Sequence, residues 1–283
     1  MRVLRVVLRD DPADRWLVER TDAELAERGH VVRHFEAEAT ARPLAGIPIG
    51  PAPRRALLAG AGDFDVVEVP QEAVIGLHDA RDASSIPPVV VRAPRLAERA
   101  WHRVNVRGAA GRPGVLERFR FPRTVIEPWR AGIRGSAAVL CAEPDDRAFL
   151  VDTLGLSADR VLPFHAGADR DDFSGGEHAS PTGAIPRLLW LGEFAPSRGA
   201  ETLVAAFVRL REEMPQLHLG IADPAGDADS IRGAFPESVR AGVEPVPAAT
   251  QAQRRATCAS HDILLSTAPA DGYDPYVPEA AAA

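Results

Sequence analysis

The chain has 283 residues, of which 46% are hydrophobic and 26% are charged, and its formal net charge at pH 7 is −7. This composition is that of an ordinary globular protein, and the length suggests about two domains of ~150 residues, each able to bury a core. The negative charge argues against a chain that binds nucleic acid over its whole surface. All 33 basic residues are arginine, which we interpret as the codon bias of a GC-rich genome.

The opening segment and the cysteines indicate the compartment. Residues 1–8 are too short and too charged for a signal peptide, and no apolar run reaches the ~18 residues of a membrane span. We therefore expect a cytoplasmic protein. Cys141 and Cys258 lie far apart in apolar surroundings. They are expected to be buried reduced thiols, and nothing in the pattern suggests a disulfide framework, a metal site or a cofactor.

The first half of the chain alternates short apolar runs with helical patterns. An amphipathic helix is predicted over about 14–28, and Gly29 then supplies the residue that a left-handed helix end prefers. Apolar runs without alternation are typical of strands buried on both faces of a parallel sheet. Such runs predict strands at 2–7, 31–35, 65–69, 89–92 and 137–141. Residues 1–166 are therefore predicted to form an N-terminal Rossmann-like domain.

A second series of the same kind begins near Arg187, after a breaker-rich linker at 167–186. Helices are predicted at 200–213, 229–235 and 250–259, and strands at 188–191, 217–221, near 243 and at 263–266. The predicted fold class is thus α/β, with two Rossmann-like, doubly wound parallel-sheet domains. The second domain, 187–283, has only four predicted strands, and 277–283 resembles the start of a helix. We therefore expect this domain to be incomplete and the chain to be truncated at its C-terminus.

One segment departs from the overall charge. Residues 92–134 hold eleven arginines and three glutamates, a local net charge of +8, interleaved with tryptophan and phenylalanine. The simpler interpretation is a solvated helical surface whose charge is offset by acidic neighbours. The alternative is a contact surface for an anionic acceptor or for anionic lipid headgroups.

Common catalytic signatures are absent from the sequence. It has no phosphate loop, no nucleophile elbow and no His/Glu pair with zinc-protease spacing. Gly60-Ala61-Gly62 precedes a predicted strand, whereas a dinucleotide fingerprint follows a strand and opens a helix. An NAD-type oxidoreductase would therefore share only the architecture.

Residues 187–199 carry the most specific motif, because they run from a predicted strand through a glycine-containing loop into a predicted helix. The segment resembles the donor-binding strand-loop-helix of family 4 retaining glycosyltransferases, in which a Gly-Arg pair follows the strand and a Lys-Gly pair opens the helix. Gly192-Glu193 stands at the first pair here, and Arg198-Gly199 stands at the second. The resemblance implies a GT-B fold, with a nucleotide-sugar donor bound by the second domain and an acceptor by the first.

Three other segments resemble the same family. Residues 160–173 are similar to its Pro-Asn-Gly-Val-Asp-x3-Phe signature at the domain junction. Asp271 and Glu279, with seven residues between them, have the spacing of its paired acidic motif. Near the end of the predicted strand at 89–92, Arg92 and Pro94 fall in a stretch that resembles one subgroup's acceptor-side loop.

The chemistry of a sugar nucleotide explains why such residues recur. A glycine turn that opens a helix offers N–H groups and a positive dipole end to a diphosphate, and a basic side chain stabilises the leaving group. The resemblance gives these roles to Gly199 and Arg198. It gives ribose binding to Glu279 and hexose orientation, the candidate catalytic role, to Asp271. Taken singly, each residue could instead be turn punctuation or a solvated helix-start residue.

The sequence departs from the family pattern at positions that perform the chemistry. Glu193 replaces an arginine, Arg198 a lysine, Asp271 a glutamate, Ala166 an asparagine and Pro94 a histidine. A unit charge about 4 Å away contributes roughly 4 kcal/mol at an effective dielectric of about 20, so Glu193 in place of a cation opposes diphosphate binding. We therefore expect donor binding that is weak, absent or in a different register.

Two functional hypotheses follow. The resemblance implies transfer of a sugar from a nucleotide-diphosphate sugar to a small or lipid-linked acceptor, with retention of configuration and without a metal. The alternative is a catalytically inactive relative or gene fragment with at most a binding role, which Glu193, Pro94 and the expected truncation favour.

Overall fold

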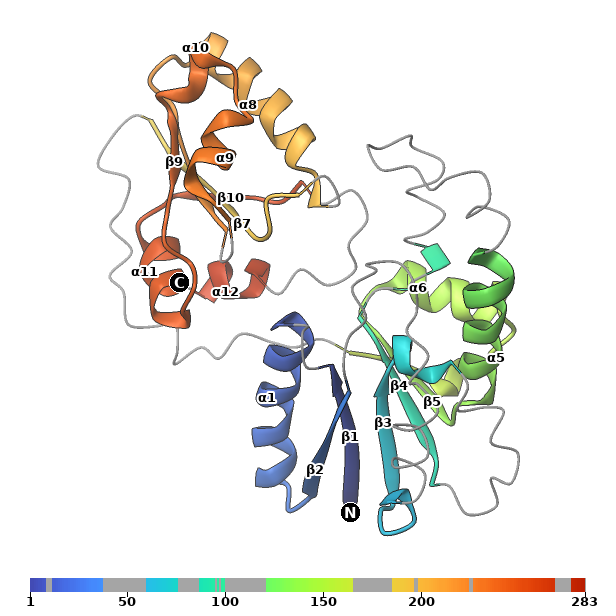
Figure 1. The fold of residues 1–283 in the computed structure, drawn as a ribbon. Helices are drawn as coiled ribbons and strands as arrows, with labels where there is room; N and C mark the ends of the chain where they lie inside the picture. Colours follow the sequence, from blue (N-terminus) through green and yellow to red (C-terminus); the bar gives the residue numbers. More distant parts are fainter. Residues whose placement is uncertain are drawn as a thin grey trace. The chain divides into compact units, whose positions relative to one another are not determined.

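The computed structural model describes residues 1–8, 12–37, 60–75, 87–94, 96, 98–99, 121–164, 185–195, 198–223, 226–267 and 276–282. The chain divides into two compact units, Met1–Ala166 and Gly167–Ala283, which are coloured blue to yellow-green and yellow to red in Figure 1. Most of the predicted linker lies outside the described residues. No helix in the described part is long and apolar enough to cross a membrane.

The first unit is built on a parallel sheet with the strand order β2-β1-β3-β4-β5-β6. The strands are β1 Arg2–Leu8, β2 Val31–Ala37, β3 Val66–Pro70, β4 Val89–Ala93, β5 Ala138–Cys141 and β6 Val161–Pro163. The order reverses between β1 and β3, which is the arrangement of a doubly wound sheet.

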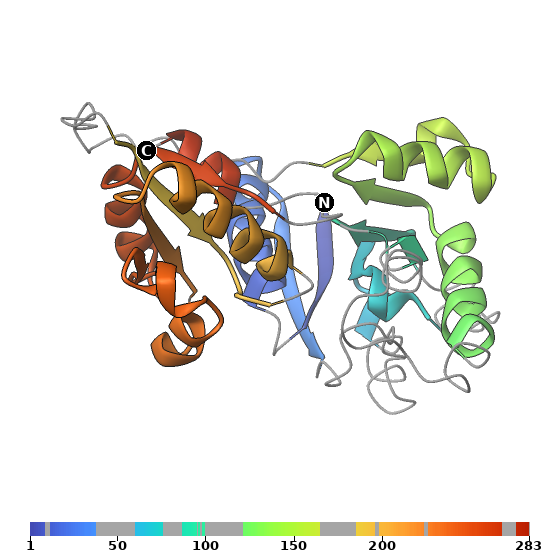
Figure 2. The ribbon, with the colours of Figure 1, turned by 90° about the horizontal axis from the view of Figure 1, so that it is seen from above.

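Helices pack on this sheet through its apolar side chains. The helices are α1 Pro12–Glu27, α5 Glu127–Gly135 and α6 Pro144–Ala148, with shorter helical turns at Gln71–Val74, Pro122–Ile126, Phe149–Thr153 and Ala158–Arg160. Figures 1 and 2 show α1 beside β1 and β2, and α5 at the other side of the unit. α5 approaches the turn after β3 so closely that a Cβ at Gly132 would lie 2.9 Å from the side chain of Val74.

Three charged side chains cross-link neighbouring strands of the first sheet. Arg5 on β1 donates to Glu68 Oε2 on β3 from Nε at 3.1 Å and from Nη2 at 2.7 Å. Arg92 on β4 donates to the other carboxylate oxygen of Glu68, and all three side chains are buried. Arg5 also pairs with Asp22 on α1 at 2.5 Å. Each of these buried charges therefore has a partner of opposite charge, as burial away from water requires.

The described part of the second unit contains a four-stranded parallel sheet in the order β10-β7-β8-β9. Its strands are β7 Arg187–Leu191, β8 His218–Ala222, β9 Val243–Pro245 and β10 Ile263–Leu265. The chain runs outward from β7 through β8 to β9 and then returns to the other side of β7. The strand order therefore switches between β7 and β10, which is where doubly wound sheets bind ligands, outside the carboxyl ends of the strands.

Helices cover both faces of this sheet. They are α8 Ala200–Glu213, α9 Ala228–Gly233, α10 Glu237–Arg240, α11 Gln251–Ala259 and α12 Tyr276–Ala282. Alternate residues of β7 face opposite ways. Leu188 and Trp190 pack in one cluster with α8, α9 and α10, whereas Leu189 and Leu191 pack in another with α11 and α12.

The helix ends follow from local sequence. Thr250 and Gln253 form a reciprocal capping box at the start of α11, with bonds of 3.2 and 3.1 Å between side chain and backbone. Asp227 caps α9 by accepting from the Ser230 N–H at 2.8 Å. Gly29 adopts φ 75° just after α1, as the sequence predicts. The α/β fold class with parallel sheets is confirmed, and α10 is an element that the sequence pattern did not predict.

Candidate functional site

A small hollow lies at the carboxyl edge of the second sheet, between β7 and β10. It is lined by Trp190 and Leu191 of β7 and by Gly192 after it, by Leu265 of β10 and by Ser266 and Thr267 after it, and by Arg198. We call it the β7–β10 hollow. Its position is the point where the strand order switches, which makes it the candidate ligand site of this unit.

Helix α8 begins at the rim of this hollow. Gly199 is its N-terminal cap, in the left-handed conformation with φ 81° and ψ 26°. A Cβ at this position would lie 2.7 Å from the carbonyl carbon of Thr267 and closer still to the oxygen, so no other residue fits without a shift. The Ala200 N–H donates to the Ala195 carbonyl at 3.2 Å, and the 14-residue helix directs the positive end of its dipole to this edge of the sheet.

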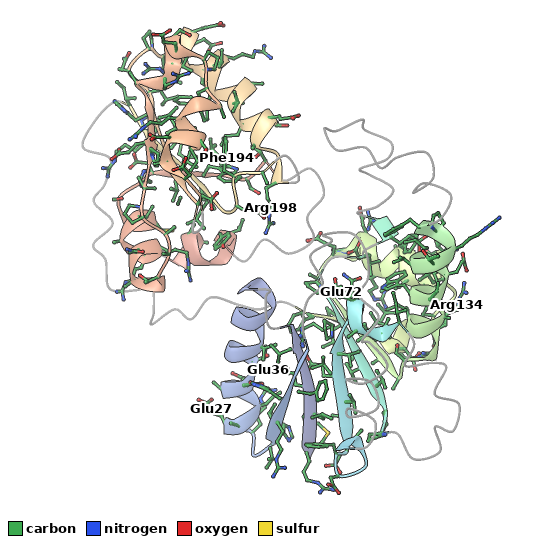
Figure 3. All side chains as sticks on the ribbon, viewed as in Figure 1. Glu27, Glu36, Glu72, Arg134, Phe194 and Arg198 are labelled. Carbon is green, nitrogen blue, oxygen red and sulfur yellow. The ribbon has the colours of Figure 1, made fainter. Side chains whose placement is uncertain are left out.

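The loop from Gly192 to Gly199, the 192–199 loop, joins β7 to α8 and is held at its first half by β8. The Gly192 N–H donates to the Ala222 carbonyl at 3.0 Å. The Phe194 N–H donates to Asp223 Oδ2 at 2.8 Å, and the Phe194 ring stacks on Phe235 at 6.0 Å. Phe194 and Arg198, near the two ends of this loop, are labelled in Figure 3.

The second half of the loop is held by the end of β10. Thr267 Oγ1 accepts a hydrogen bond from Trp190 Nε1 at 3.0 Å and donates one to the Arg198 carbonyl at 3.3 Å. The backbone of the loop is therefore fastened on both sides of the hollow. An anion bound in the hollow would therefore contact the start of α8 and the guanidinium of Arg198, both on a backbone held by hydrogen bonds.

No known protein-family model matches the sequence, and no curated protein matches it closely enough to count as a relative. Solved structures do match. Sucrose-phosphate synthase from Thermosynechococcus elongatus superposes with a TM-score of 0.69 at 16% identity, over 99% of this chain and 78% of that chain. HepE of Anabaena, in complex with UDP and glucose, has a TM-score of 0.63 at 14% identity, over 100% and 78% of the two chains. A glycosyltransferase from Rickettsia africae has a TM-score of 0.53 at 11% identity, over 94% and 72%.

The chain has the GT-B glycosyltransferase fold. The matches extend over both units, and each unit has the parallel, doubly wound sheet expected of that fold. Membership of family 4 stays a prediction from the motifs.

Four of the predicted donor residues of this GT-B fold meet at the β7–β10 switch point. Gly192 and Arg198 line the hollow, Gly199 caps α8, and Glu193 lies between the two glycines with its side chain exposed to solvent. Solvent around Glu193 screens its charge, so its opposition to a diphosphate is smaller than the full Coulomb value for a close pair.

The acidic pair is only partly within the described structure. Asp271 lies outside the described residues. Glu279 belongs to α12, whose first residue, Tyr276, packs its ring within 3.7 Å of the place a Cβ would take on Gly192. The Tyr276 side chain thus lies beside the start of the 192–199 loop, and the roles of Asp271 and Glu279 stay predictions.

Sequence reasoning missed three residues of the site. The sequence pattern predicts a strand at Trp190 and a strand end just before Thr267, but it gives no functional role to Trp190, Thr267 or Asp223. For Thr267 and Asp223, the available signal is a polar residue directly after a parallel strand, because strand ends of one sheet meet at one edge. Trp190 lies within β7 and carries no such signal.

The predicted acceptor-side residues belong to the first unit of the GT-B fold. Arg92 lies within strand β4, where its guanidinium pairs with Glu68 and its side chain is 1% exposed. Pro94 follows β4 directly and is half-buried. The structure thus gives Arg92 a partner inside the sheet, and an acceptor role for either residue stays a prediction.

Five of the eleven arginines in 92–134 fall within the described residues, and three of these pair with carboxylates. Arg92 contacts Glu68, Arg99 contacts Asp146 at 2.5 Å, and Arg130 holds Glu98 with two hydrogen bonds. Arg134 donates to the Leu154 carbonyl at 3.1 Å. These contacts favour the interpretation in which acidic neighbours offset the charge, and contact with lipid stays a prediction.

Both cysteines are buried free thiols, as the sequence predicts. Burial raises the pKa of Cys141 to about 11, so this thiol stays protonated near neutral pH. Within the described part of the chain, no three His, Cys, Asp or Glu side chains gather as a metal site requires.

Proposed function

We propose that the chain binds a nucleotide-diphosphate sugar at the β7–β10 hollow and transfers its sugar to an acceptor held by residues 1–166. The observation that carries this proposal is the start of α8 at the switch point. There Gly199 admits the close approach of β10, and Arg198 lines the same hollow. A diphosphate placed against the α8 start would meet N–H groups, the positive end of the helix dipole and a guanidinium.

The chemistry of the reaction assigns a role to each of these groups. The sugar–phosphate bond breaks as negative charge grows on the departing diphosphate, and Arg198 with the α8 N–H groups stabilises that charge. This source of positive charge belongs to the protein, in keeping with a transfer that requires no metal. Asp271 would orient the hexose and Glu279 would accept from ribose hydroxyls. Retention of configuration is proposed from the motif resemblance.

The ligands of the similar solved structures suggest which nucleotide to test first. The HepE structure contains UDP and glucose, and a second HepE structure contains UDP-glucose. UDP is therefore the natural first probe of the hollow in this chain, with GDP as the alternative base.

An inactive, binding-only protein is the second candidate, and Glu193 is the residue that favours it. Its carboxylate stands on the same loop as Arg198 and opposes the charge of a diphosphate. Exposure of Glu193 to solvent limits that opposition, so we propose weak binding of the nucleotide, with a Kd above the low-micromolar range.

Turnover of nucleotide sugars distinguishes the two candidates. The purified chain is incubated with UDP- and GDP-linked hexoses, and free nucleotide is measured with a coupled phosphatase assay. Release of UDP or GDP above the rate given by Arg198→Met supports the transferase. Nucleotide binding without release from any donor supports the binding-only protein instead.

A further inference from the structure

One hydroxyl group connects the two strands that border the hollow with the loop before α8. Thr267 Oγ1 receives the indole N–H of Trp190, from β7, at 3.0 Å and donates to the backbone carbonyl of Arg198 at 3.3 Å. The Trp190 side chain is buried, and both Trp190 and Thr267 line the β7–β10 hollow. We call this chain of hydrogen bonds the Trp190–Thr267–Arg198 relay.

The relay orients the peptide that precedes the α8 cap. In a trans peptide, the C=O of one residue and the N–H of the next point in opposite directions. Because Thr267 holds the Arg198 carbonyl, it also fixes the direction of the Gly199 N–H, which points away from Thr267. The left-handed φ of Gly199, 81°, then starts the helix from that fixed peptide.

The Thr267 backbone approaches Gly199 closely. The missing Cβ of Gly199 lets the Thr267 backbone approach, and this brings its hydroxyl within reach of the Arg198 carbonyl. Trp190 connects this contact to the other anchor of the loop, since its ring meets Phe194 edge-on at 5.7 Å between centroids.

We propose that Thr267 is a positioning residue for nucleotide binding, acting through the Arg198 peptide, and that Trp190 sets the orientation of its hydroxyl. The indole N–H can only donate, so the Thr267 oxygen must accept from it, and the hydroxyl proton is left for the Arg198 carbonyl. This inference rests on the proposed function, because it assigns Thr267 to the same diphosphate site.

Three variants test the relay. Thr267→Val removes the hydroxyl and keeps the shape, and Thr267→Ser keeps the hydroxyl. Thr257→Val is the matched control, because the Thr257 hydroxyl also donates to a backbone carbonyl, that of Pro247 at 2.9 Å, elsewhere in the same unit. In calorimetric titrations with UDP, Thr267→Val should bind roughly three- to tenfold more weakly than the unmodified chain. Thr267→Ser and Thr257→Val should stay within about twofold of it.

Two measurements without nucleotide separate positioning from a general loss of stability. Thr267→Val should speed amide hydrogen exchange in the first turn of α8, and Thr257→Val should leave it unchanged. Thr267→Val should also shift the fluorescence emission of Trp190. Because the chain has four tryptophans, the Trp190 signal is obtained by subtracting the spectrum of Trp190→Phe.

These measurements separate failure of the proposed function from failure of the positioning role of Thr267. If the unmodified chain does not bind UDP or GDP, the proposed function fails and the role of Thr267 in nucleotide binding fails with it. If the unmodified chain binds and Thr267→Val binds equally well, the proposed function stands and the positioning role is wrong. Equal changes in amide hydrogen exchange at the first turn of α8 for Thr267→Val and Thr257→Val would also overturn the positioning role of Thr267.

Discussion

Gly199 lies against the backbone carbonyl group of Thr267, so that a Cβ at position 199 would stand 2.7 Å from its carbonyl carbon. This contact joins the start of α8 to the end of β10 across the point where the strand order of the second sheet switches. The candidate site of the protein depends on it, because it brings a helix start and Arg198 to one hollow.

Substitution of Gly199 by alanine should therefore be costly. The left-handed φ and the collision with Thr267 together should lower the free energy of unfolding by about 2 to 4 kcal/mol. Gly155→Ala is the control, since Gly155 has a similar φ of 72° with nothing within 4 Å of a Cβ, and should cost only about 1 kcal/mol. Urea denaturation followed by fluorescence measures both. Equal costs would show that the contact with Thr267 is unimportant.

Glu193→Gln should strengthen binding of UDP. Removal of an exposed carboxylate beside the hollow should lower Kd by roughly three- to tenfold at low salt, and the gain should shrink as salt rises. Glu213→Gln, at the far end of α8 and about 20 Å away along the helix, should have no such effect. Calorimetric titration at two salt concentrations tests this, and a gain that does not depend on salt would mean that Glu193 acts by another route.

Arg92→Met should act on stability. Among the described residues, loss of this guanidinium leaves Glu68 paired with Arg5 alone, so the first unit should lose about 2 to 3 kcal/mol of its free energy of unfolding. Arg123→Met, at an exposed position of the same unit, should be nearly neutral. Denaturation curves and nucleotide-release rates, measured on the same variants, distinguish a stabilising role of Arg92 from an acceptor-side role. Unchanged stability with reduced release would favour the acceptor-side role that the sequence suggested.

The His261 side chain should make the stability of the second unit depend on pH. Burial lowers its pKa below the usual value of about 6.5, although a hydrogen bond between Nδ1 and the Thr257 carbonyl at 2.8 Å partly opposes this shift. The unfolded chain therefore takes up the proton more readily than the folded chain. The contribution to stability is present above about pH 6.5 and is lost as pH falls through the lowered pKa.

His261→Gln should flatten the dependence of unfolding midpoint on pH between about 7 and 5. His218→Gln, at an exposed position on β8, should leave the slope unchanged. Thermal denaturation of the three proteins over this range provides the comparison. A slope that survives in His261→Gln would assign the pH dependence to other groups.

The sequence predicted the fold well because its signals are local. The apolar runs of β7 and β8 and the pattern of α8 are strong, and the structure bounds α8 at Ala200 and Glu213, as predicted. Helix α10 escaped prediction because a four-residue helix has no detectable period. Both Gly29 and Gly199 were recognised at helix ends, since a glycine that borders a periodic segment is typical of a helix terminus.

The site was predicted less completely, for a physical reason. Gly192, Arg198 and Gly199 are predicted because they belong to one contiguous segment that resembles a family motif, whereas Thr267 meets them only through the pairing of β10 with β7. The motif places Arg92 in an acceptor-side loop, because the sequence does not reveal its partner, Glu68, on the neighbouring strand. Contacts across a sheet depend on strand order, which a single sequence does not specify.

Titration of the protein with UDP and GDP by calorimetry tests the central claim most directly, with Gly199→Ala as the paired variant. We predict saturable one-to-one binding of one nucleotide, with a Kd between roughly 10 µM and 1 mM at low salt, and its loss in Gly199→Ala. Absence of saturable binding of either nucleotide, or binding that Gly199→Ala leaves intact, would contradict the assignment of the β7–β10 hollow as the nucleotide-sugar site.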